Sequence, residues 1–250
     1  GIAPGVTLLN VRVLDARGYG TAGDVSRGID RALDEGAHLI NLSVGFNHRP
    51  TWSMGGHGYS CPDGNCEMCR SVNNAVTLSE GAVAVIVAAG NEHEFCEFLR
   101  RNGNADAFDT ELGCPGQAQY ALTVGALTKQ TFLTAPFSSR GPTAYGLAKP
   151  DISAPGVNIT SAAVVPRDAG GKVLGGLTRA DLSRKESGTS MAAPIVTGVA
   201  ALLTQRLLAA GHDLAAMRAA LRAELLTSAF LPLAAPAHEV GIGRVSLARL

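Results

Sequence analysis

The sequence predicts an α/β fold in which helices cover both faces of one doubly wound, mostly parallel sheet, giving three layers. Short β-branched and apolar runs alternate along the chain with helical patterns, which is the order that βαβ units produce. The run "AVAVIVAAG" is almost continuously apolar, as in a strand buried on both faces. The 250 residues, 46% of them hydrophobic, suffice for the core of one large domain.

The first elements follow from hydrophobic periodicity. Residues 7–13, "TLLNVRV", predict a strand, and residues 38–44, "HLINLSV", predict the next. Between them, residues 21–37 predict a helix with Val25, Ile29 and Leu33 along one stripe. These three segments make the first strand–helix–strand unit.

The remaining elements continue the alternation. Residues 71–81 and 200–226 predict helices, and residues 82–90 and 120–127 predict buried strands. "FSSRGP" and "KPDISAPG" are punctuated by Gly and Pro and predict turns, the second fixed by Asp151. The closing "GIGRVSLARL" predicts a short extended piece that runs into a final turn. No repeat or linker divides the chain, so residues 1–250 form one predicted domain.

Charge and hydropathy argue against two classes of partner. Lys and Arg total 21, as do Asp and Glu, so no net field favours nucleic acid or an anionic membrane. No apolar run reaches the length expected of a membrane span, and residues 1–15 lack the regions of a signal peptide. We therefore expect neither nucleic acid nor a membrane as partner.

A serine lies at the predicted start of a small-residue helix in "KESGTSMAAPIVTGVAALL". Four backbone N–H groups lack partners at such a start, and a hydroxyl from Thr189 or Ser190 ordinarily caps them. The same helix end carries partial positive charge, which would stabilise an oxyanion forming beside Ser190. The residues alone leave both roles open, a cap and a nucleophile.

Two strand ends supply further candidates. In "VIVAAGNEH", Asn91 follows a buried strand at the edge where open α/β sheets bind ligands, and its amide could donate to an oxyanion. A turn is the ordinary role of such a Gly-Asn pair. "NLSVG", residues 41–45, is another strand end, with backbone that could accept an extended ligand.

Six stretches together carry a resemblance to a known family. "GIAPGVTLLNVRVLD", "NLSVG", "AAGN", "FSSRGP", "KPDISAPG" and "GTSMAAP" occur in the order found in subtilisin-like serine proteases, the subtilases. The Gly-Thr-Ser-Met-Ala-x-Pro stretch is highly specific, and the likeness covers nearly the whole chain. The resemblance implies a subtilisin-like fold and a serine endopeptidase of peptidase family S8 that acts on polypeptides. The Ala-, Arg- and Leu-rich composition from Ala200 on indicates a bacterial source.

The resemblance also implies roles for individual residues. Ser190 would be the acyl-accepting nucleophile, with its backbone N–H and the Asn91 side chain as oxyanion donors. Two backbone stretches would bind the substrate, one as a strand edge and one as the floor of the first specificity pocket. These residues are Ser43, Val44 and Gly45 for the edge, and Ala88, Ala89 and Gly90 for the floor.

The family's Asp and His motifs are not found in these 250 residues. In subtilases both precede the segment that "GIAPGVTLLNVRVLD" matches, in the order Asp, His, Ser. We expect them from an N-terminal subtilase segment of the same or a separate chain, so that this chain alone is inactive and lacks the N-terminal portion of the fold. Residues 7–13 would then have an unpaired side.

The absence of a base is also compatible with a protein that does not cleave peptides. The chain could be a catalytically dead peptide-binding domain or a scaffold. Alternatively, a histidine within the chain could substitute as the base, although each is more typical of a loop or surface position. The histidines are His38, His48, His57, His93, His212 and His238.

Five cysteines fall in the middle third, three of them in a Cys-rich insert at residues 46–70. "CPDGNCEMC" has C-x₄-C-x₂-C spacing, and C-x₂-C is a frequent half-site for zinc. One or two disulfides are favoured over zinc and over buried reduced thiols, because extracellular proteases often carry disulfides. The cysteines are Cys61, Cys66, Cys69, Cys96 and Cys114.

No cofactor is required by the implied reaction. The resemblance makes calcium possible in the complete domain, but its strongest site in the family uses residues before Gly1, and no ligand for it is assigned here. Asp15, Asp24, Asp109 and Asp151 are interpreted as turn, cap or surface residues. A secreted or extracytoplasmic location is favoured over a cytoplasmic one.

Overall fold

The structure is a computed structural model with a sheet at its centre. It describes residues 1–46, 61–79, 83–103, 109–165, 167–168, 170–173, 175, 177–178, 180–227, 230–231 and 233–246. Over these residues the sheet has six strands in the order β1-β2-β3-β4-β8-β7. The strands are β1 Leu39–Leu42, β2 Ala84–Ala88, β3 Leu122–Leu127, β4 Ile152–Pro155, β7 Phe230–Leu231 and β8 Arg244–Val245.

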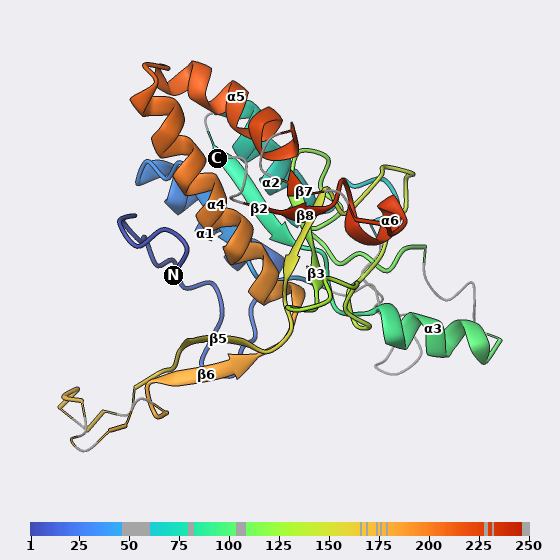
Figure 1. Ribbon diagram of the computed structural model, residues 1–250, viewed down its shortest axis with the longest axis horizontal. Helices are drawn as coiled ribbons and strands as arrows, with labels where there is room; N and C mark the ends of the chain where they lie inside the picture. Colours follow the sequence, from blue (N-terminus) through green and yellow to red (C-terminus); the bar gives the residue numbers. More distant parts are fainter. Residues whose placement is uncertain are drawn as a thin grey trace.

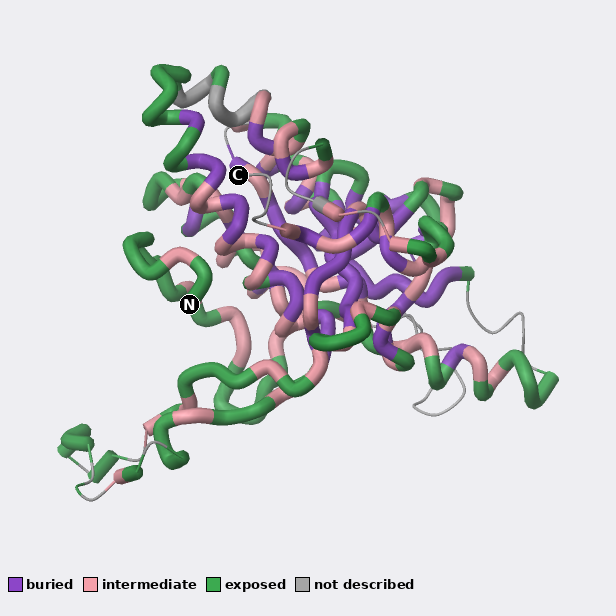
Figure 2. Tube along the Cα trace, in the orientation of Figure 1, coloured by how far each residue is buried: buried purple, intermediate pink, exposed green. Residues whose placement is uncertain are grey.

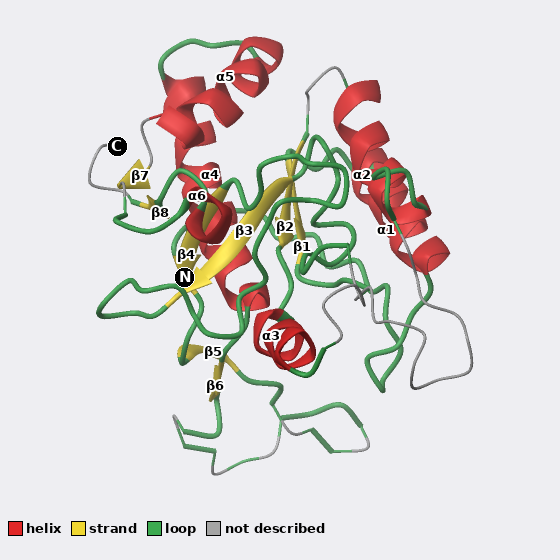
Figure 3. Cartoon of the chain, turned by 90° about the vertical axis from the view of Figure 1, so that its right-hand side faces the viewer, coloured by secondary structure: helices red, strands yellow, loops and turns green. Residues whose placement is uncertain are grey.

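All pairs in this sheet are parallel except β7 with β8, which is antiparallel. Helices α1 (Ala22–Asp34) and α2 (Glu67–Leu78) cover one face, and α4 (Thr189–Ala209) and α5 (Leu214–Thr227) cover the other (Figure 3). The predicted three-layer, mostly parallel α/β fold is therefore confirmed.

Two further helices and a two-stranded ribbon lie beside these layers. Helix α3 (His93–Arg101) follows β2, and α6 (Ala237–Val240) precedes β8. Strands β5 (Ile159–Ala162) and β6 (Ser183–Glu186) form a separate antiparallel ribbon that projects from the body (Figure 1).

Each face of the sheet has its own hydrophobic core. The α4 core joins α4 to inward-facing strand residues such as Ile86, Val124 and Ile152. The α1–α2 core uses the neighbouring residues Val85 and Val87, because side chains alternate between the two faces of a strand. Figure 2 shows the buried residues gathered along the sheet and the helix sides that face it.

Helix α1 begins where its capping residues allow. Thr21 is the N-cap, and its side chain and that of Asp24 form a reciprocal capping box. Val25 and Ile29 are buried as predicted, and Leu33 is partly buried against the same core.

The prediction of a strand at residues 7–13 was wrong. This segment lies outside the sheet, and β1 is the edge strand of the sheet among the described residues. Val11 and Val13 pack against the α1–α2 core, whereas Leu8 is 86% exposed. A strand requires a hydrogen-bonded neighbour, and the described residues place none beside this segment.

Helix α4 corrects two expectations. The predicted helix at 200–226 is two helices that separate at Gly211, whose φ of 87° is left-handed. With 21 residues, α4 is also long and apolar enough for a membrane span by length and composition, contrary to prediction. In the structure it packs on the sheet, with Val196, Val199 and Leu203 in the α4 core.

"KPDISAPG", predicted as a turn, contains strand β4, which pairs with β3. Asp151, predicted to fix that turn, instead joins three segments through its partly buried carboxylate. It accepts from Thr123 N at 2.7 Å, Lys149 Nζ at 2.6 Å and Arg222 Nη2 at 2.8 Å. Burial lowers the pKa of Lys149, and the adjacent carboxylate opposes that shift.

The other boundary differences are small. Helix α2 starts at Glu67, before the predicted residue 71. The predicted extended piece near the C-terminus contains β8, while the final turn lies outside the described residues. Of the predicted insert at 46–70, residues 47–60 are likewise outside them.

Candidate active site

Ser190 lies in the first turn of α4. The N-cap is Gly188, which has no side chain, so Ser190 is not the cap that one interpretation of the sequence proposed. The hydroxyl of Ser190 donates to Ser43 O at 3.2 Å, and Ser43 Oγ donates to Ser190 O at 2.9 Å. The start of α4 is thereby joined to the segment that follows β1.

Asn91 lies at the other side of the same helix start. Its Oδ1 accepts from Thr189 N at 2.9 Å and from Thr189 Oγ1 at 3.1 Å. A backbone N–H is a donor only, so the atom facing it must be the amide oxygen. This fixes the orientation of the Asn91 amide and leaves its Nδ2 group to donate elsewhere.

Thr189 is a positioning residue that the sequence analysis treated only as a possible cap. It is buried, and its hydroxyl accepts from Gly90 N at 3.1 Å while donating to Asn91 Oδ1. One side chain therefore ties the carboxyl end of β2 to the start of α4. Its place directly before Ser190 in "GTS" is the signal that could have identified it.

The predicted substrate-binding residues follow neighbouring strands. Ser43, Val44 and Gly45 come after β1, and Ala88–Gly90 end and follow β2, which pairs in parallel with β1. Both stretches thus lie at the carboxyl edge of the sheet, as expected for ligand sites in this architecture.

Glycine is required at position 90. Its φ is 112°, and a Cβ there would lie 2.8 Å from Ser139 Oγ and 3.2 Å from Gly113 N. Ser139 also accepts from Glu92 N at 3.0 Å and donates its own N–H to Gly90 O at 3.0 Å. The turn that carries Asn91 is therefore held from both sides.

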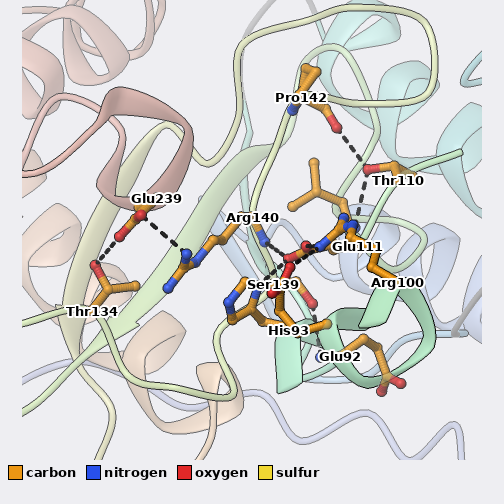
Figure 4. Close-up of polar contacts among 12 residues, drawn as sticks. Glu92, His93, Arg100, Thr110, Glu111, Thr134, Ser139, Arg140, Pro142 and Glu239 are labelled. Carbon is orange, nitrogen blue, oxygen red and sulfur yellow. Dashed lines mark hydrogen bonds and ion pairs between the residues drawn. The ribbon is translucent and has the colours of Figure 1, made fainter. Parts of the chain in front are cut away.

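His93 belongs to a separate polar network (Figure 4). Its Nδ1 lies 2.9 Å from Glu111 Oε2, and Glu111 also accepts from Arg100 Nη1 at 2.6 Å and from Arg140 N at 3.0 Å. Glu97 contacts the same guanidinium at 2.6 Å. His93, Glu97 and Glu111 could geometrically hold a metal, but both carboxylates are already paired with the Arg100 guanidinium.

Among the described residues, the remaining histidines make no hydrogen bond to Ser190, which is bonded to Ser43. His38 precedes β1, at the opposite end from Ser43, and His212 follows the far end of α4, a helix about 30 Å long at 1.5 Å per residue. His238 is in α6. His48 and His57 are outside the described residues.

The five cysteines separate into a cluster and a single thiol. The ligand atoms of Cys61, Cys66, Cys69 and Cys114 lie within 4.8 Å of one another. Cys96 lies apart on α3, where burial and then Glu111 raise the pKa of its thiol to about 12.

Comparison with known proteins indicates the family to which this chain belongs. The model of the subtilase family matches residues 1–243. Serine protease AprX of Bacillus subtilis (strain 168) is 32% identical over 219 residues, covering 82% of this chain and 44% of AprX. The chain thus spans less than half the length of this relative.

Solved structures agree with that match. The self-cleaved protease domain of PatA is 29% identical with a TM-score of 0.59, covering 93% of this chain and 67% of that domain. EpiP, an epidermin leader peptide processing serine protease from Staphylococcus aureus, has a TM-score of 0.69 at 20% identity, covering 100% and 58%. From its sequence and its fold, this chain belongs to the subtilase family.

Proposed function

We propose that this chain is the carboxyl-terminal majority of a serine endopeptidase domain that hydrolyses peptide bonds through an acyl-enzyme on Ser190. The observation that carries the proposal is the arrangement around Thr189. It fixes the Asn91 amide at the helix start whose next residue is Ser190. A nucleophile and an oxyanion donor are thereby held at the positive end of one helix.

The reaction assigned to these groups is acyl transfer. Ser190 Oγ attacks the substrate carbonyl carbon while its proton passes to an imidazole base, which then protonates the departing amine. Water hydrolyses the resulting ester by the reverse sequence of proton transfers. Asn91 Nδ2 and Ser190 N–H donate to the carbonyl oxygen as it becomes negative in each step.

The substrate would be a polypeptide bound in extended form. Ser43–Gly45 would pair with its backbone as an added strand, and Ala88–Gly90 would line the pocket for one side chain. The small side chains at 88 and 89 suit a large apolar group in that pocket.

The base and its carboxylate would come from an N-terminal subtilase segment outside these 250 residues, on the same or a separate chain. Two features support this: β1 ends the sheet, and residues 7–13 lie beyond it without a strand partner among the described residues. By itself this chain would retain at most about 10³–10⁴-fold rate enhancement over water, as for subtilisin lacking triad members.

The second candidate is a peptide-binding domain without catalysis. It is favoured by one observation: no histidine of the described residues contacts Ser190, whose hydroxyl donates to Ser43 O. The binding surfaces would be those of the enzyme, so only a test of Ser190 reactivity separates the two.

The test uses the protein with its natural upstream sequence and a fluorophosphonate probe. We expect labelling of Ser190 and hydrolysis of peptides, both abolished in Ser190→Ala and kept in Ser161→Ala, a matched control on the exposed ribbon strand β5. Absence of labelling in the folded, full-length protein would favour the peptide-binding candidate.

Asn91→Ala tests the oxyanion role separately. We expect kcat to fall by about 10²–10³-fold with little change in KM, the magnitude measured for the equivalent change in subtilisin. A rise in KM with kcat unchanged would assign Asn91 to substrate binding instead.

Calcium in the complete domain and an extracytoplasmic location stay predictions, checked by metal analysis and cell fractionation.

A further inference from the structure

Four cysteine sulfurs converge beside the candidate active site, and we call Cys61, Cys66, Cys69 and Cys114 the cysteine cluster. Cys61 Sγ is 3.8 Å from Cys69 Sγ, which is 3.4 Å from Cys114 Sγ. Cys69 and Cys114 are fully buried and Cys61 is 3% exposed. Three members come from one short stretch, and the fourth comes from a loop 45 residues further along.

We propose that the cysteine cluster binds one zinc ion as a structural site. In tetrahedral Zn(Cys)₄ each Zn–S bond is about 2.3 Å, so the sulfurs are about 3.8 Å apart. The two Sγ–Sγ distances fit this edge to within a few tenths of an ångström. Four thiolates complete the coordination and leave no open position, which is the arrangement of a structural rather than a catalytic zinc site.

The same distances argue against disulfides. A disulfide requires sulfurs about 2.05 Å apart, whereas Cys69 Sγ has neighbours at 3.8 and 3.4 Å on two different cysteines. Pairing Cys69 with either one would draw it away from the other. The disulfides favoured by the sequence are therefore not supported by this geometry.

The surroundings of the sulfurs suit thiolates. Cys66 is the N-cap of α2 and makes no side-chain cap bond, so its sulfur lies at the positive end of that helix. Cys66 N donates to Cys61 Sγ at 3.4 Å, and the buried Gln117 donates Nε2 to Cys114 Sγ at 3.7 Å. Such N–H donors orient and stabilise metal-bound ligands.

A zinc ion here would act on the predicted substrate edge. Cys114 exchanges two backbone hydrogen bonds with Phe46, at 2.8 and 3.0 Å, immediately after the predicted substrate edge Ser43–Gly45. A Cβ on Gly45 would lie only 3.0 Å from Cys114 O. The ion would therefore fix that edge relative to α2, which carries Cys66 and Cys69.

The primary test measures metal in the tag-free protein, purified without chelator. We expect one equivalent of zinc per chain by inductively coupled plasma mass spectrometry. Replacement by cobalt should give the visible absorption bands of tetrahedral thiolate-bound Co²⁺. These readouts do not depend on proteolysis, so they remain decisive if the proposed function fails.

Matched variants locate the ion. Cys69→Ser and Cys114→Ser should lose the zinc, while Cys96→Ser on α3 should keep a full equivalent. Should a cluster variant fail to fold, the wild type gives the same answer: mercurial titration should release zinc in step with modification of four thiols.

Two results would overturn the inference. In the first, the intact mass after alkylation shows that cysteines of the cluster are not alkylated because they are joined in disulfides. The other is alkylation of all five thiols in native protein that contains no zinc, which would make the cluster a group of buried, reduced side chains.

Discussion

The two faces of the sheet are built from different materials. The α4 core is formed by aliphatic side chains, with small residues such as Ala192 and Ala193 allowing α4 to lie close to the strands. The α1–α2 core contains three buried cysteines beside Met68 and Val72, and it borders the open end of the sheet at β1. One face thus packs aliphatic side chains, and the other packs aliphatic side chains together with the sulfurs of the cysteine cluster.

The difference separates the candidate site into two parts that are held from opposite faces of the sheet. Ser190 and Asn91 are positioned from the α4 face, through Thr189 and the helix start. The segment after β1, which is the predicted substrate edge, is held on the other face through Phe46 and Cys114. Perturbing each face should therefore have separable effects.

The largest effect is expected from removing the proposed zinc. At a thousand-fold excess over Kd, a bound ligand adds about 4 kcal/mol to the free energy of unfolding, which is about 8–16 °C in Tm for a domain of this size. Chelation should lower Tm by at least this amount, and hydrogen exchange should show α2 losing protection before α4. Equal loss from both helices would remove the distinction between the faces.

A substitution within the α4 core should come next. Leu203 is 1% exposed, so Leu203→Ala should lower the free energy of unfolding by about 2–5 kcal/mol through lost burial and the cavity left behind. Denaturant unfolding measures this, and zinc content should not change. The control is Leu208→Ala in the same helix, where the side chain is 42% exposed and the loss should be much smaller.

The smallest effect is expected at the cap of α1. Thr21→Ala removes the hydroxyl that accepts from Asp24 N at 3.1 Å, so stability should fall by about 1 kcal/mol. Thr21→Ser retains that acceptor and should recover most of the loss. A fall equal to that of Leu203→Ala would mean that the α1 capping box contributes as much as a buried core side chain.

Much of the sheet could be predicted from sequence because local patterns determine it. The continuous apolar run of β2 and the stripe Val25–Ile29 of α1 each indicate burial without knowledge of the rest. Residues 7–13 have an equally good strand pattern, but a strand also depends on its neighbour, which no local pattern specifies. Strand β4 was missed because its Pro and Gly neighbours resemble a turn.

The candidate site divides in the same way. The motif around Ser190 identified the nucleophile candidate, and the family resemblance pointed to Asn91. The hydrogen bonds through Thr189 span 98 and 99 residues, so sequence could not show which atom of Asn91 is engaged. Spacing grouped Cys61, Cys66 and Cys69, but only the fold joins Cys114 to them and leaves Cys96 outside.

A zinc-thiolate site and a secreted location favour different redox environments. Thiolates persist most readily in a reducing compartment, whereas disulfides form in an oxidising one. The thiol measurements described for the cysteine cluster therefore bear on location too, since an intact zinc-thiolate site in native protein would weigh against a secreted enzyme.

The first thirteen residues have a consequence for the timing of assembly. Ile2 lies against α4, where a Cβ on Gly198 would be 2.6 Å from it, and Val13 lies against α1, 2.3 Å from a Cβ on Gly28. The chain therefore loops around the rim of the sheet outside β1, fastened on both faces. A strand that pairs with β1 must therefore bind before both of these contacts have formed. Otherwise it can bind only after one of the two contacts has broken. Mixing separately folded pieces should accordingly complete the sheet slowly, whereas folding them together should complete it quickly.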